Sequence, residues 1–379
     1  MNTTISVFGR FHAFNLAHQL STRGHLKRLI TTYPSFEVKK YGVPSTSVKS
    51  LLHYEVFRRT LGWMPKWIAK KGNVLVNRQF ERSVPRHISK DTDVYVGWSG
   101  TAERGLHRAK EIGAAAFLER GSSHIEYQRD LLREEARRFD TNVNLPDSDT
   151  IEKEKREYEK ADAIILPSRF TVRSFLKKGF DASKLIQVPY GVNTDQFRRV
   201  EKKDDKFRVI YAGQMNLRKG VHYLLKAFAE LDLPNSELWL LGKKRSVIDP
   251  YFEKYKGYFE FLGHKPQSDL YKYYSQGTVF AICSVEEGLA MVQPQAMACG
   301  LPLVCTPNTG GEDLIREGEE GFVVPIRDVE ALKEQLTWCY EHQRECRKMG
   351  EKAKRRVRNH FTWSDYADRV VESYEKLLE

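Results

Sequence analysis

One stretch in the C-terminal half constrains the fold more than any other. Two short apolar segments of strand length, residues 278–283 and 301–306, enclose good helix formers at residues 291–298. Gly300 stands where a left-handed cap would end that helix. A strand, a helix, a glycine stop and a second strand form a βαβ unit. This unit predicts a parallel sheet that binds its ligands at the carboxyl ends of the strands.

The turn after the first of these strands carries an acidic side chain, Glu287. The helix start expected around Leu289, Ala290 and Met291 presents backbone N–H groups that favour a phosphate. Glu287 would then accept hydrogen bonds from hydroxyls on the group that carries the phosphate, and Gln295 on the helix can both donate and accept. The combination predicts a sugar-nucleotide site. The plainer interpretation makes Glu287 and Gln295 solvated surface residues.

Residues 287–302 read EGLAMVQPQAMACGLP, and Gly310 and Gly311 follow. This text resembles the retaining glycosyltransferases of the family 4 type, whose signature is a Glu, seven residues and a second Glu. The chain departs from that pattern at Gln295, where the family has the carboxylate that holds the ribose hydroxyls. The resemblance is strong over residues 193–361 and weak before them. It implies an α/β chain of GT-B fold, with two Rossmann-like, doubly wound parallel-sheet domains facing a cleft.

The length and the order of the predicted elements agree with two domains. A chain of 379 residues exceeds one typical core, and strands alternate with helices throughout. We predict an N-terminal acceptor-side domain at residues 1–192, completed by a C-terminal helix at 362–379. Residues 193–361 then form the domain that binds the nucleotide sugar, and the polar segment 193–206 begins it as a hinge.

A second constellation follows the strand predicted at residues 207–213. Arg218 and Lys219 lie between this strand and the next helix, where two cations would neutralise a departing diphosphate. Cations at the start of a helix are disfavoured by the helix dipole. Their presence therefore favours a role in binding an anion over the alternative that they simply face solvent. In the family, an Arg follows the glycine and a Lys precedes the next one. Lys219 matches the Lys, whereas Gln214 occupies the Arg position.

The resemblance also implies a turn at His264 and Lys265 that contacts the nucleotide base, largely through backbone atoms. The predicted donor-binding residues are therefore Gly213, Gln214, Leu289, Ala290, Met291, Gln295, His264 and Lys265.

Two segments of the N-terminal half supply candidates for the opposite side of the cleft. The turn after the first strand holds Gly9, Arg10 and His12, and the family resemblance implies contact with the acceptor or the diphosphate. A plain structural turn is the alternative. His124 follows the strand predicted at 114–119, where family members have a His that reaches the donor sugar. A lone His is more often structural, so both interpretations of His124 stay open.

The positive charge is concentrated at the N-terminal end. Residues 1–90 hold 16 Lys and Arg against 3 Asp and Glu, a net charge of +13, whereas the remainder carries −1. Within residues 45–90, aromatic side chains alternate with cations such as Arg58, Arg59, Lys70 and Lys71. This pattern suits a helix on an anionic membrane surface. It also suits an ordinary amphipathic helix with its aromatic face in the core, while nucleic acid is disfavoured because no binding motif accompanies it.

The remaining features indicate a cytoplasmic protein, peripheral at most at the cytoplasmic face of the membrane. The sequence has no apolar run of 18 residues and no signal-peptide pattern at Met1. Five cysteines without C-x-x-C spacing favour reduced thiols. Scattered histidines and the lack of an Asp-x-Asp signature lead us to expect no metal and no cofactor.

Together these features predict a metal-independent hexosyltransferase that uses a nucleotide-diphosphate sugar, and the family resemblance implies that it retains anomeric configuration. Its acceptor would be a lipid-linked or polysaccharide-precursor glycan. Glu287 would orient the sugar ring, Arg218 and Lys219 would stabilise the diphosphate, and His124 with the loop at 9–12 would act from the other domain. Two alternatives remain: a GT-B phosphorylase or epimerase, and a catalytically silent nucleotide-sugar-binding protein, which the glutamines at two family positions suggest.

Overall fold

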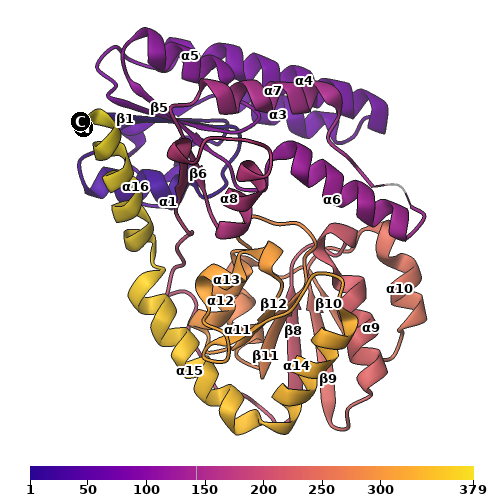
Figure 1. Cartoon of the computed structure of the whole chain (residues 1–379). Coiled ribbons are helices and arrows are strands. Elements are labelled where there is room, and N and C mark those ends of the chain that lie inside the picture. Colours follow the sequence, from indigo (N-terminus) through magenta and orange to yellow (C-terminus); the bar gives the residue numbers. More distant parts are fainter. Residues whose placement is uncertain (142) are drawn as a thin grey trace.

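Two parallel sheets organise the chain in the computed structural model, which describes residues 1–141 and 143–379 (Figure 1). The N-terminal sheet has, in spatial order, β3 (Val48–Ser50), β2 (Leu26–Thr31), β1 (Thr3–Val7), β4 (Val94–Trp98), β5 (Ala115–Glu119), β6 (Ala163–Leu166) and β7 (Leu185–Gln187). Strands β1 and β4 are buried at every residue. Strands that are buried along their whole length suit a parallel sheet covered by helices on both faces.

The C-terminal sheet repeats this plan. Its strands, in spatial order, are β10 (Glu260–Gly263), β9 (Ser236–Leu241), β8 (Phe207–Ala212), β11 (Val279–Ile282), β12 (Leu303–Cys305) and β13 (Gly321–Val323). The chain order reverses between β8 and β11, as it does between β1 and β4 in the first sheet. The carboxyl ends of strands at such a reversal open a crevice, so each domain has one place suited to a ligand.

Helices cover both faces of each sheet (Figure 1). The N-terminal domain contains α1 (Ala13–Thr22), α2 (Ser35–Lys39), α3 (Leu52–Leu61), α4 (Lys66–Ser83), α5 (Glu103–Glu111), α6 (Ile125–Arg138), α7 (Ser148–Lys160) and α8 (Arg169–Leu176). The C-terminal domain contains α9 (Val221–Leu231), α10 (Asp249–Lys254), α11 (Leu270–Tyr274), α12 (Val292–Ala298), α13 (Gly311–Leu314), α14 (Val329–Glu341) and α15 (Gln343–His360).

The last helix, α16 (Trp363–Leu378), returns to the N-terminal domain and lies beside α1 (Figure 1). Its buried Tyr366 donates a hydrogen bond to Glu119 at 2.7 Å, and the ring of Tyr374 packs 4.6 Å from that of Phe117. The chain thus crosses between the domains twice. The two crossings touch where Val192 pairs with Thr362 in an isolated bridge.

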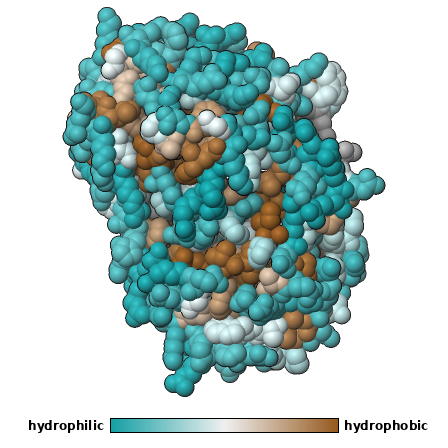
Figure 2. All heavy atoms as spheres, viewed as in Figure 1, coloured by the Kyte–Doolittle hydropathy of each residue, from teal (hydrophilic) through white to brown (hydrophobic). Residues whose placement is uncertain are grey.

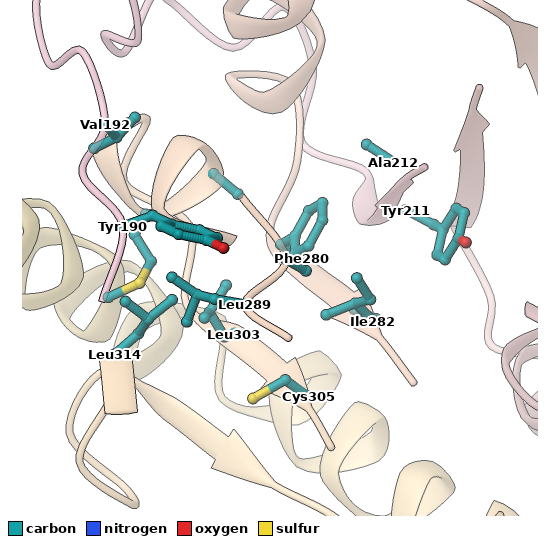
Figure 3. Close-up of a cluster of buried hydrophobic side chains, with 14 of the residues drawn as sticks. Tyr190, Val192, Tyr211, Ala212, Phe280, Ile282, Leu289, Leu303, Cys305 and Leu314 are labelled. Atoms are coloured by element: carbon teal, nitrogen blue, oxygen red, sulfur yellow. The ribbon is translucent and has the colours of Figure 1, made fainter. Parts of the chain in front are cut away.

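Apolar side chains hold the C-terminal sheet to the segment that enters it. Figure 3 shows side chains of β8, β11 and β12 packed with Leu289 and with Tyr190 and Val192 from the first crossing. All of these residues are less than 10% exposed. Burial of this kind stabilises by about 25 cal/mol per Å² of apolar surface removed from water. Because Ile282 of β11 and Leu289 both belong to this cluster, the loop that carries Glu287 is anchored at both ends.

The structure has the predicted fold, with differences at particular elements. The sequence pattern predicts no strand between residues 24 and 90, yet β2 and β3 lie there, because their Lys and Arg side chains interrupt the apolar pattern. The segment 45–90 is not one continuous helix: α3 and α4 form a hairpin that turns at residues 62–65.

Two further expectations concern the whole chain. Among the described residues, no helix is long and apolar enough to cross a membrane. The five cysteines are free thiols, all of them buried.

Candidate active site

The predicted acid and cations meet at the carboxyl ends of two neighbouring strands. Glu287 lies in the loop after β11, and the 3-10 helix η4 (Leu217–Lys219) follows β8. The Lys219 ammonium contacts Oε2 of Glu287, and Nη2 of Arg218 lies 3.9 Å from Oε1 of Glu287. Glu287 and Lys219 are each about one-sixth exposed. The structure therefore assembles the charge cluster that the sequence predicts.

Local sequence explains why η4 comes so close to β11. The side chain of Asn216 caps η4 by accepting a hydrogen bond from the Lys219 N–H at 3.0 Å. Gly220 then adopts a left-handed φ of 65°, and a Cβ at this position would lie 1.9 Å from the carbonyl oxygen of Cys283. Only glycine permits both the turn and this approach.

Burial governs the charge of Lys219. Desolvation lowers the pKa of Lys219 to about 7, with a smaller contribution from the nearby Arg218 and opposition from Glu286. The ammonium is consequently close to half protonated at neutral pH. An incoming anion would favour its charged form, so this lysine suits a ligand that brings its own negative charge.

A cavity of about 450 Å³ opens at the same carboxyl edge of the C-terminal sheet, although Arg218, Lys219 and Glu287 do not line it. Five of the predicted donor residues line it: Gly213, Gln214, His264, Lys265 and Gln295. Gln295 is 4% exposed, and its Oε1 lies 3.5 Å from the Tyr274 hydroxyl. The volume and the mixed polar lining fit a nucleoside-sized ligand.

The loop before α12 only partly matches the predicted phosphate cradle. The N–H of Ala290 donates to the Thr309 carbonyl at 3.0 Å, so it is not free for a ligand. Leu289 and Ala290 are buried, and their side chains do not line the cavity. Met291 lines a second, adjacent cavity. Fewer backbone N–H groups are therefore free to bind a phosphate here than the predicted helix start implies.

The second cavity, of about 830 Å³, lies between the domains. Arg10 lines both cavities, and Gln295 does so from the opposite domain. The Arg10 guanidinium is held by a hydrogen bond to the Tyr41 hydroxyl at 2.6 Å. Figure 2 shows apolar residues gathered in the band between the two domains, on a face that is otherwise largely hydrophilic.

The turn at residues 9–12 faces this interdomain cavity in part. Gly9 forms the turn with a φ of 96°, and Arg10 and Phe11 reach the cavity. His12 points the other way: it is 5% exposed, lies 3.3 Å from Glu119 and packs against Trp98. The structure therefore places His12 in the core of its domain, because its aromatic neighbours exclude it from the cleft.

His124 is also placed in the core rather than at the cleft. Its ring is 1% exposed among the rings of Tyr158, Phe175 and Phe180, and Nδ1 caps α6 by accepting from the Glu126 N–H at 3.3 Å. Burial lowers the pKa of His124 to about 3, which keeps it neutral. The structural interpretation of this histidine, left open by the sequence, is the one that the geometry supports.

Some cavity residues were not anticipated from the sequence. Lys243 follows β9 and lines the smaller cavity beside Gln214. Phe11 lines the larger one, is 68% exposed and has a φ of 43°, a strained value for an aromatic residue. Lys243 was detectable as a cation at a strand end. Phe11 carries no comparable signal.

Among the described residues, no group of three or more His, Cys, Asp or Glu side chains is arranged to hold a metal ion. Metal independence of the reaction stays a prediction.

The two-domain architecture matches that of solved structures. Sucrose-phosphate synthase from Thermosynechococcus elongatus superposes with a TM-score of 0.78 at 19% identity, covering 100% of this chain and 99% of that structure. Anabaena Alr3699/HepE, solved in complex with UDP, superposes with a TM-score of 0.70 at 14% identity, covering 99% and 100%. Two Rossmann-like domains arranged in this way are the GT-B fold.

Residues 192–356 match the family model of glycosyl transferases group 1. Bacillus subtilis EpsD is 29% identical over 208 residues, which are 50% of this chain and 54% of EpsD. A GDP-mannose-dependent phosphatidylinositol monomannoside mannosyltransferase of Mycolicibacterium smegmatis is 25% identical over 240 residues, 56% of this chain and 62% of that enzyme. The chain thus matches little more than half the length of these relatives.

Proposed function

We propose that the protein transfers a glycosyl residue from a nucleoside-diphosphate sugar to a hydroxyl acceptor, with retention of anomeric configuration. The observation that carries the proposal is the contact of Lys219 with Glu287, beside Arg218, at the carboxyl edge of the sheet where a nucleoside-sized cavity also opens. Two cations that meet one acid at the carboxyl ends of neighbouring strands match a diphosphate joined to a hydroxylated ring.

Each group has a chemical task in this proposal. The bond between the anomeric carbon and the diphosphate oxygen breaks, and its electron pair stays on the diphosphate, which Lys219 and Arg218 stabilise. Glu287 accepts hydrogen bonds from sugar hydroxyls and orients the ring. The acceptor oxygen bonds to the same face of the anomeric carbon, and its proton passes to the departing phosphate oxygen.

Related proteins support the class of donor. HepE has also been solved with UDP-glucose, and the mycobacterial relative is named for a GDP-mannose donor. The identity of the base is left open by the cavity, because its lining is mixed: Leu241 and Leu270 are apolar, whereas Lys243, His264 and Lys265 are polar.

The experiment begins with binding. Uridine, guanosine and adenosine diphosphates are each titrated against the protein, and we expect one to raise the melting temperature by mass action. The corresponding sugar nucleotides are then tested for transfer. Glu287→Gln and Lys219→Ala should each lower the rate by about 100-fold or more. Glu319→Gln, at a half-exposed carboxylate that lines neither cavity, is the matched control. Undiminished rates in both site variants would refute the assignment.

We propose further that the acceptor is presented at an anionic membrane surface bound by the α3–α4 hairpin. The large apolar side chains Leu52, Val56, Phe57, Trp63, Met64 and Trp67 are each at least 40% exposed there, Trp63 at 96%. Residues 52–83 also hold seven Lys and Arg against two Glu. Exposed tryptophans beside cations suit an interface between water and anionic headgroups. Phe80 of α4 is buried in the core, but Phe57, Trp63 and Trp67 are not, which favours a surface role over a helix whose whole aromatic face is in the core.

A protein that binds a nucleotide sugar without turnover is the second candidate. It is favoured by one observation: amides stand at Gln214 and Gln295, in the cavity itself, where the family resemblance implies an Arg and a carboxylate. Binding of a nucleoside diphosphate with no transfer to any saccharide or lipid-linked acceptor would support it.

A further inference from the structure

Glu286, the residue before Glu287, accepts hydrogen bonds from both domains. Glu286 is fully buried and lines neither cavity. Its Oε1 accepts from the Ser123 N–H at 3.2 Å and from the Ser123 hydroxyl at 2.8 Å. Its Oε2 accepts from Gln128 Nε2 at 2.8 Å and from Arg218 Nε at 2.7 Å. Four donors on one carboxylate leave no part of it unpaired.

The four donors come from both domains. Ser123 and Gln128 belong to the N-terminal domain and supply three hydrogen bonds, whereas Arg218 belongs to the C-terminal domain and supplies one. Burial opposes ionisation of Glu286, but Arg218 with the hydrogen bonds from Gln128 and Ser123 holds its pKa below the usual value. Glu286 is therefore a carboxylate at neutral pH, and its charge depends on partners across the domain boundary.

This pairing determines which part of Arg218 is available. Among contacts of the described residues, the guanidinium donates a hydrogen bond only through Nε, to Glu286. Its terminal Nη2 lies on the side of Glu287, 3.9 Å away, and the side chain is 31% exposed. Because Glu286 holds Nε, the terminal amino groups of Arg218 stay available to bind an anion.

The helix that supplies Gln128 makes a second contact of the same kind. Glu135 lies seven residues further along α6, on the same helix face, and is fully buried. It accepts from His222 at 3.1 Å, from Tyr223 at 2.8 Å and from Arg327 at 2.7 Å, all in the C-terminal domain.

Helix α6 contacts the C-terminal domain through both of these carboxylate clusters. Figure 1 shows α6 between the domains on the side away from α15 and α16, where the chain crosses over. No covalent connection holds the domains together on the α6 side. Polar interdomain contacts of this type can be hydrated on both sides when they separate, so they are reversible. Separation would remove three of the four hydrogen bonds of Glu286.

We propose that Glu286 is a positioning residue, which fixes Arg218 for the diphosphate only when Ser123 and Gln128 of the other domain are docked against it. The inference rests on the proposed function, because it assigns the diphosphate to Arg218. It adds a coupling: closure of the domains and affinity for the second phosphate favour one another. Such couplings change affinity by about 5- to 150-fold.

The test compares nucleoside diphosphate with nucleoside monophosphate, because a merely structural defect would weaken both alike. The probes are uridine, guanosine and adenosine mono- and diphosphates, titrated calorimetrically against the full chain. In Gln128→Glu, an isosteric change sets a second carboxylate against Glu286 while leaving Arg218 and the smaller cavity unaltered. We expect this variant and Glu286→Gln to lose about tenfold in the preference for diphosphate over monophosphate.

The matched control is Arg133→Gln on the exposed side of α6, whose ionic partner Asp130 belongs to the same helix. It should keep the wild-type preference. Small-angle scattering should show a larger radius of gyration for Gln128→Glu than for Arg133→Gln. A wild-type protein that binds none of the diphosphates refutes the proposed function together with this inference. Binding by the wild type with an unchanged preference in Gln128→Glu refutes this inference alone.

Discussion

At the scale of single residues, the site depends on charges whose state is set by burial. Lys219 and Glu287 are in contact, and both are largely removed from water. Because the pKa of Lys219 is lowered to about 7, its charge varies in the range where the protein would function. In unfolded chains its pKa is higher, so between the two values the unfolded state binds more protons. The contribution of Lys219 to stability therefore rises with pH in that window.

The same shift predicts how ligand affinity depends on pH. Between pH 7.5 and 9 the free protein loses the Lys219 proton, whereas a bound diphosphate restores it. Affinity should fall by up to about tenfold per pH unit in this interval. The phosphate itself, with a pKa of about 6, is already deprotonated there. Calorimetric titration measures the effect. Lys219→Arg, which stays charged, should show a flat profile, and a wild-type profile that is also flat would contradict the shift.

At the scale of elements, part of the positive charge of the α3–α4 hairpin is paired within the protein, whereas its tryptophans are exposed. Glu55 is buried and pairs with both Arg58 and Arg59, at 2.7 and 2.9 Å. Lys70 lies 3.8 Å from Asp147. Part of the predicted positive patch is therefore neutralised within the protein. The exposed tryptophans around the turn are left as the strongest feature of the hairpin.

This balance yields a prediction for membrane binding. In sedimentation with vesicles, Trp63→Ser combined with Trp67→Ser should lower binding to anionic phosphatidylglycerol by tenfold or more, since both rings would leave the headgroup region. Neutralising Arg58, Arg59, Lys70 and Lys71 should weaken binding as well and reduce its salt dependence. Tyr258→Ser, at an aromatic residue 42% exposed in the other domain, is the control. Equal binding to neutral phosphatidylcholine would contradict the anionic preference.

At the scale of the whole molecule, the last helix makes the N-terminal domain depend on the end of the chain. Tyr374 of α16 is fully buried against Phe117 of β5, some 250 residues earlier in the sequence. Its hydroxyl has no hydrogen-bond partner among the described residues. The ring therefore contributes through packing, and the hydroxyl only adds the cost of removing it from water.

Two substitutions separate these contributions. Tyr374→Ala should lower the free energy of unfolding by about 3–5 kcal/mol, because it removes a buried ring and leaves a cavity. Tyr374→Phe keeps the ring and should be neutral or slightly stabilising. Urea denaturation measures both. Nucleotide affinity per folded molecule should stay at the wild-type level in each variant, and a loss in Tyr374→Phe equal to that in Tyr374→Ala would contradict the packing argument.

The sequence by itself determined the two-domain fold and the meeting of Glu287 with Lys219. Both follow from local signals: apolar strands, a glycine-ended helix, and polar residues at the ends of strands that become neighbours in a parallel sheet. Only the tertiary structure decided that His12 and His124 are core residues. Their surroundings are aromatic rings from distant segments, and no local pattern encodes them. The role of Glu286 is likewise invisible in sequence, because three of its four hydrogen bonds come from a domain some 160 residues earlier.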